Sequence, residues 1–178
     1  MARAFVAVVP PPPVLDAVAG ALGDPEVPGA RFMRPEQWHL TLQFLGNQVE
    51  LDEVAEALGD LALRSGPVRL GGFGAFPNER RGRVLWLGVA EGAPLLAQLA
   101  AAVGVLLGPR GYPPDDRDRH PHLTLARCKV PTDLRAAVGA LGQDPVGPEW
   151  RVEEVVLYES LTRATGAKYM ERGRFPLP

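Results

Sequence analysis

The sequence has one cysteine, Cys128, and a formal net charge of only −2 over 178 residues. A single cysteine excludes an intramolecular disulfide and a cysteine-based metal cluster, and it fits a reducing compartment. The near-neutral charge excludes a protein that coats nucleic acid through excess positive charge alone, so a phosphate-bearing substrate would need a local basic pocket. The candidate residues for such a pocket are Arg80, Arg81, Arg83, Arg117, Arg119, Arg127 and Lys129.

The chain also lacks a long hydrophobic run near its start. The apolar segment RAFVAVV at residues 3–9 is short, is followed by prolines and has no small-residue cleavage pattern. We therefore expect neither secretion nor membrane spanning, and we expect a cytoplasmic protein. The sequence does not determine the oligomeric state, for which a monomer is the default. The 46% of hydrophobic residues is enough for one domain, or for two small lobes that share a core.

Hydrophobic periodicity predicts a similar order of elements in each half of the chain. In the first half, strands are expected at 3–9, 37–46 and 68–73, and helices at 14–22 and 51–63. In the second half, strands are expected at 83–90 and from 122, helices at 94–107 and 132–141, and a final strand pair at 150–160 and 167–177 around the turn TRATG. This order predicts two lobes related by an internal repeat, within a single bilobal domain over residues 1–178.

The four-residue sequence HLTL occurs at 39–42 and again at 122–125, and it uses two of the three histidines. Side chains alternate along a strand, so His39 and Thr41 should share one face while the leucines occupy the other. If the lobes face each other, two imidazoles and two hydroxyls converge on one cleft. Retention of the leucines for packing after a duplication is an alternative. It does not explain why His and Thr, which are poor core residues, occupy the other face in both copies.

Two histidines and two threonines suit phosphoester chemistry without a metal. Displacement at phosphorus needs a base for the attacking water and an acid for the leaving oxygen, and histidine can do either near neutral pH. Threonine hydroxyls and an arginine can bind the non-bridging oxygens. Arg127 lies five positions beyond His122, so simple alternation does not bring it to the same face, and its role depends on a bend or a bulge.

Two other classes of function compete with this hypothesis. His120 and His122 could share a zinc ion with His39, but neither motif carries a carboxylate and Pro121 precedes the strand. A non-catalytic RNA-end or nucleotide-binding protein is the second alternative. Two intact motifs disfavour it, because binding alone would tolerate the loss of either histidine.

The segments RFMRPEQWHLTLQFLG and HPHLTLARCK, the openings RAFVAV and RVLWLGV, and the ending FPL resemble the RNA 2',3'-cyclic phosphodiesterase family. These proteins, also called 2'-5' RNA ligase-like, belong to the two-histidine phosphoesterases. The resemblance implies an α+β fold with two pseudo-symmetric lobes, whose antiparallel sheets are flanked by helices and surround a central cleft. It implies hydrolysis of RNA 2',3'-cyclic phosphate ends to a 2'-phosphate and, in some members, reversible joining of tRNA halves through a 2'-5' bond.

The resemblance also implies roles for individual residues. His39 is the expected proton donor and His122 the expected proton acceptor, while Thr41 and Thr124 bind phosphate. Arg127 is expected to help hold the phosphate. Phe5 resembles a base-stacking position of the substrate site, with a position in the core as an equal alternative. The expected substrates are RNA with a 2',3'-cyclic phosphate end, including tRNA fragments, or a small cyclic nucleotide, and no cofactor or metal is expected. The loop at 108–119 should border the cleft, where Arg117 and Arg119 are predicted to tune the preference for substrate length.

Overall fold

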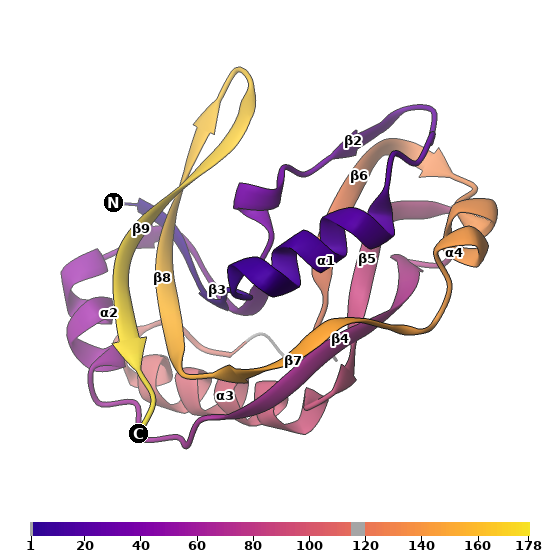
Figure 1. Cartoon of the computed structure of the whole chain (residues 1–178). Coiled ribbons are helices and arrows are strands. Elements are labelled where there is room, and N and C mark those ends of the chain that lie inside the picture. The colour runs from indigo at the N-terminus through magenta and orange to yellow at the C-terminus, as the bar shows by residue number, and fades with distance from the viewer. Residues whose placement is uncertain (1, 115–119) are drawn as a thin grey trace.

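The computed structural model describes residues 2–114 and 120–178, which form nine strands and four α-helices (Figure 1). The strands are β1 (Ala2–Val8), β2 (Ala30–Phe32), β3 (Leu40–Val49), β4 (Gly66–Phe76), β5 (Gly82–Glu91), β6 (Leu123–Thr132), β7 (Pro145–Val152), β8 (Glu154–Arg163) and β9 (Gly166–Pro176). The helices are α1 (Pro12–Leu22), α2 (Leu51–Leu58), α3 (Ala93–Leu107) and α4 (Arg135–Leu141), with short 3-10 turns η1 (Pro35–Gln37) and η2 (Gly108–Arg110).

The helices follow from the spacing of their apolar residues. In α1, Val14, Val18 and Leu22 recur at four-residue spacing and are buried, a proline begins the helix, and Gly23 ends it with φ of 60°. α2 ends at Leu58, just before Gly59, which makes it shorter than the helix expected at 51–63. The helix expected at 132–141 begins only at Arg135, since Thr132 still belongs to strand β6.

All the strands pair antiparallel in the order β7-β4-β5-β6-β3-β1-β8-β9, with β2 added alongside β6. The two strands that carry HLTL, β3 and β6, are neighbours in the middle and share only the pair Leu40 and Leu123. This single pair joins two curled halves, which Figure 1 shows as a half-open barrel. The predicted α+β fold with two antiparallel lobes is confirmed.

The strands that make up each lobe differ from those that a simple repeat of the two halves predicts. The strand expected at 150–160 is divided at Glu153: β7 pairs with β4, whereas β8 pairs with β1 in the other half. Strand β4 was expected to close the first half, but it lies in the half that contains the second motif, and the unpredicted strand β2 pairs there too. Each lobe therefore combines strands from the first and the second half of the sequence. Local periodicity specifies a strand but not its partner, which is decided by contacts between distant residues.

Helix α3 lies against the sheet and buries the row Leu96, Leu99, Val103 and Leu107. Apart from Gln98, its exposed residues are mostly small or apolar, among them Val105, and the segment Ala93–Arg110 is also long and apolar enough to cross a membrane. The core helix of a soluble protein passes the same test. The row of buried leucines gives α3 a packing partner within the described part of the chain.

Candidate active site

The two HLTL copies share an irregularity in strand pairing at the same position of the motif. The pairing of β3 with β1 passes from Gln43 to Thr41, and the pairing of β6 with β5 passes from Ala126 to Thr124. The second leucine of each motif is thus an extra residue in a β-bulge. The extra residue shifts the alternation of side chains by one position. Arg127, five positions after His122, therefore lies on the same face of the strand as His122 and Thr124.

A cavity of about 570 Å³ lies where the two motifs meet. His39, Thr41, His122, Thr124 and Arg127 all line it. The structure thus brings together five of the six residues expected at the site. The position in the first motif that corresponds to Arg127 is occupied by Phe44, a ring that lines the same cavity and is 46% exposed.

Each histidine is oriented by a backbone carbonyl two residues earlier. His39 Nδ1 lies 2.7 Å from the oxygen of Gln37, and His122 Nδ1 lies 2.7 Å from the oxygen of His120. A carbonyl oxygen only accepts, so Nδ1 carries the proton in both rings and Nε2 is the nitrogen that can exchange protons with a substrate. His39 Nε2 lies 3.0 Å from the Thr41 hydroxyl, which donates to it when the ring is neutral. Both copies of the motif therefore hold their histidine in the same tautomer, with the proton on Nδ1.

Two aromatic rings, Phe5 and Tyr169, pack against the His39 imidazole, and Tyr169 also lines the cavity. Phe5 stacks on the imidazole with ring centroids 4.7 Å apart, and Tyr169 meets it edge-on at 5.4 Å. Phe5 also stacks against Tyr158 and is only 2% exposed. A ring so covered offers no face to a nucleobase, so the base-stacking role expected of Phe5 is not supported and the core alternative is favoured. The position of Phe5 on an apolar strand was compatible with base stacking and with core packing alike.

Burial of the imidazole lowers the pKa of His39 from 6.5 to about 4. The hydrogen bond to Gln37 acts in the opposite direction, and the positive charges of His122 and Arg127 lower the pKa further. At neutral pH His39 is therefore uncharged in the absence of substrate, in agreement with its acceptor geometry toward Thr41.

We expect this low pKa to make the fold less stable in acid. The unfolded chain binds a proton at His39 near pH 6.5 and the folded chain only near 4, so stability is complete above 6.5 and is lost as the pH falls toward 4. Between pH 7 and pH 4.5 the loss from this residue is about 2 kcal/mol. Urea unfolding of the wild type and of His39→Asn at both pH values measures it. An equal pH dependence in the two proteins would contradict the expected pKa.

The environment of His122 also contains aromatic rings that the motif did not indicate. Phe76 meets the His122 ring edge-on with centroids 4.9 Å apart, and Trp86 lies at 6.4 Å. Trp86 pairs with Thr124 across the β5–β6 ladder, so the two share a face of the sheet. Tyr169, Phe76 and Phe44 were missed by sequence analysis, since each is an isolated aromatic residue on a strand without a distinguishing pattern.

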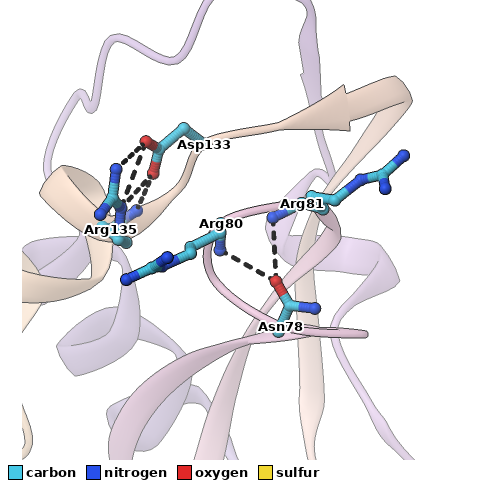
Figure 2. Close-up of polar contacts among 5 residues, drawn as sticks. All are labelled: Asn78, Arg80, Arg81, Asp133 and Arg135. Carbon is cyan, nitrogen blue, oxygen red and sulfur yellow. Dashed lines mark hydrogen bonds and ion pairs between the residues drawn. The ribbon is translucent and has the colours of Figure 1, made fainter.

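The other basic candidates lie apart from this cavity or outside the described residues. Figure 2 shows Arg80 and Arg81 in the β4–β5 turn, where both backbone N–H groups donate to Asn78 Oδ1 while the two guanidinium groups point in opposite directions. Arg83 donates to the Lys129 carbonyl at 2.8 Å. Among the described cavity residues, Arg127 is the guanidinium that faces the histidines. Arg117 and Arg119, expected to tune substrate length, lie outside the described residues.

The zinc alternative finds no support in the described residues. Within 2–114 and 120–178, no cluster of three or more His, Cys, Asp or Glu side chains is suitably placed to hold a metal ion. His39, His120 and His122 are accordingly not placed as a set of three metal ligands.

Comparison with known proteins points to one family. Residues 11–164 match the model of the 2'-5' RNA ligase superfamily. The chain is 35% identical over 144 residues to the RNA 2',3'-cyclic phosphodiesterase of Aeropyrum pernix, covering 78% of this chain and 81% of that protein. It is 39% identical over 159 residues to the enzyme of the same name from Thermus thermophilus, covering 84% and 76%. The crystal structure of E. coli LigT complexed with 3'-AMP superposes with a TM-score of 0.76 at 26% identity, covering 99% and 98%.

Proposed function

Because this chain belongs to the 2'-5' RNA ligase superfamily, we propose that it is an RNA 2',3'-cyclic phosphodiesterase that hydrolyses cyclic phosphate ends to a 2'-phosphomonoester without a metal ion. The observation that carries the proposal is the convergence of His39 and His122 on one cavity, each with Nδ1 bonded to a carbonyl and Nε2 as the reactive nitrogen. Such a pair provides one base and one acid in compatible tautomers.

In the proposed reaction, water attacks the phosphorus of the cyclic diester while one histidine accepts its proton through Nε2. The new P–O bond forms as the bond from phosphorus to O3' breaks, and the second histidine donates its proton to O3'. Thr41, Thr124 and Arg127 hydrogen-bond the non-bridging oxygens, on which negative charge accumulates. The products are a 2'-phosphate and a free 3'-hydroxyl. If the 5'-hydroxyl of a second RNA replaces water as the nucleophile, the same displacement of O3' forms a 2'-5' bond, and in the reverse of that step the two histidines exchange roles.

We assign the acid role to His39 and the base role to His122, as the family resemblance implies. A histidine with a pKa of about 4 holds almost no proton at neutral pH, so the acid role requires that binding of the anionic phosphate raises the pKa. A phosphate beside Nε2 both adds an opposite charge and accepts a hydrogen bond from the protonated ring. Titration of His39 by NMR with and without a non-hydrolysable phosphate ligand measures this increase, and a pKa that stays near 4 in the complex would assign the base role to His39.

The proposed substrate is RNA with a 2',3'-cyclic phosphate end, including tRNA fragments, or a small cyclic nucleotide. We propose that the protein acts on it in the cytoplasm, as a monomer. The first experiment is incubation of such an RNA with the protein in excess EDTA, followed by identification of the product. A 2'-phosphate supports the proposal in full. A 3'-phosphate would reverse the leaving group, and turnover only after zinc or manganese is added would replace the metal-free mechanism.

We expect Thr124→Val to lower kcat by roughly tenfold to a hundredfold, because it removes one hydrogen bond to a charged phosphate oxygen, worth about 1.5–3 kcal/mol. Valine keeps the shape of threonine, so little change in folding stability is expected. Thr124→Ser retains the hydroxyl and is the matched control, with activity near the wild-type value. Equal losses in the valine and serine variants would show that the hydroxyl does not bind the phosphate.

A further inference from the structure

The β8–β9 hairpin reaches the other half of the sheet through side-chain hydrogen bonds. Its tip presents the carbonyls of Thr165 and Ala167, which accept from Arg31 Nη2 and, at 2.8 Å, from Gln37 Nε2. Arg31 lies on β2, which pairs with the strand of the second motif, whereas β8 and β9 belong to the half of the first motif. The hairpin is therefore held to the half of the second motif as well as to its own half of the sheet.

Gln37 is the residue at which this anchoring meets the candidate active site. Its backbone carbonyl accepts the Nδ1 proton of His39 at 2.7 Å. Its side chain donates to the Ala167 carbonyl and, through Oε1, accepts from the backbone N–H of Arg34 at 3.3 Å. One half-buried glutamine thus connects His39, the η1 turn and the hairpin.

The same hairpin supplies a second contact with His39. Tyr169 lies two residues after the acceptor Ala167, and its ring edge meets the His39 ring with centroids 5.4 Å apart. A shift of the hairpin relative to η1 would therefore move the Tyr169 ring relative to the His39 imidazole and would break the bond from Gln37 to the Ala167 carbonyl. The side chain of Gln37 opposes such a shift.

Within the described residues, the second motif has no counterpart of the hydrogen bond from the Gln37 side chain to the hairpin. His120 holds the position equivalent to Gln37, and its carbonyl accepts the His122 Nδ1 proton at 2.7 Å. Its side chain is exposed, and within residues 2–114 and 120–178 it makes no hydrogen bond comparable to that of Gln37. The carbonyl contact is common to both copies, while the side-chain tether belongs to the His39 copy.

We infer that Gln37 is a positioning residue, whose side chain holds the η1 turn against the β8–β9 hairpin so that the Gln37 carbonyl keeps His39 in the Nδ1–H tautomer. Nε2 then faces the cavity with its lone pair, ready to exchange the proton that the reaction requires. The catalytic consequence rests on the proposed function, whereas the effect on the tautomer is a property of the folded protein. The two can be tested separately.

The test uses Gln37→Met, which keeps the length of the side chain but removes both of its hydrogen bonds. Imidazole ¹⁵N chemical shifts report the tautomer of neutral His39 at pH 7. In the wild type we expect the Nδ1–H form, and in Gln37→Met a mixture of both tautomers. With a cyclic phosphate substrate, kcat should fall about tenfold with KM nearly unchanged, the effect of losing a hydrogen bond of about 1.4 kcal/mol.

Glu36→Met is the matched control, because Glu36 is exposed on the same turn and the new residue is the same. It should leave the tautomer and kcat at wild-type values. An unchanged tautomer in a folded Gln37→Met protein would overturn the inference, whatever the activity. A changed tautomer in a protein whose wild type hydrolyses no cyclic phosphate would instead uphold the positioning role and refute the proposed function.

Discussion

Alanine at His39 or at His122 is expected to lower kcat by about 10²–10⁴-fold each, the usual contribution of a general acid or base. The two rings line one cavity and each has Nε2 as its reactive nitrogen, so each substitution removes one of the two proton transfers. The double variant should lose little more than the worse single variant, because residues that act as a unit are not additive. Initial rates with a short RNA ending in a 2',3'-cyclic phosphate measure all three.

The third histidine supplies the control for this experiment. His120 is exposed and contributes to the site through its backbone carbonyl, which alanine retains, so His120→Ala should keep activity within a few-fold of the wild type. Binding of the same RNA should survive in all the variants. If the wild type binds this RNA but neither wild type nor variants turn it over, the non-catalytic RNA-end binding module replaces the enzyme.

Phe5→Ala is expected to lower the free energy of unfolding by about 3–5 kcal/mol, since the ring is 2% exposed and its removal leaves a cavity. The same substitution should raise the pKa of His39 from about 4 toward 6.5, because Phe5 stacks on that imidazole and its loss admits water to the buried face. Urea denaturation measures the first effect and an NMR titration of His39 the second.

Phe44→Ala is the matched control for this substitution. Phe44 contacts Phe5 with ring centroids 5.9 Å apart but is 46% exposed, so the loss of stability should be about 1 kcal/mol or less and the pKa of His39 should change little. An equal loss of unfolding free energy in Phe44→Ala and Phe5→Ala would mean that the exposed Phe44 ring contributes as much to core packing as the buried Phe5 ring. A His39 pKa that stays near 4 in Phe5→Ala would mean that other groups exclude water from the imidazole.

Most of the local structure could be predicted from the sequence. The helices at 14–22 and 94–107 and the strands that contain HLTL follow from the period of apolar residues, which depends on neighbours a few positions away. The repeated His and Thr predicted that four side chains converge on one cleft, and His39, Thr41, His122 and Thr124 do line one cavity. The pairing of β8 with β1 could not be predicted, because the strand expected at 150–160 carries no signal of where it divides.

The sequence by itself singled out five residues that line one cavity, all in or just after a repeated four-residue motif: His39, Thr41, His122, Thr124 and Arg127. The tertiary structure decided how they differ. A bulge at the second leucine turned Arg127 toward the cavity, and Phe5 and Tyr169, both distant from His39 in sequence, enclosed that imidazole and lowered its pKa. The reason is that a local pattern reports the neighbours of a residue along the chain, whereas burial and orientation depend on every segment that folds against it.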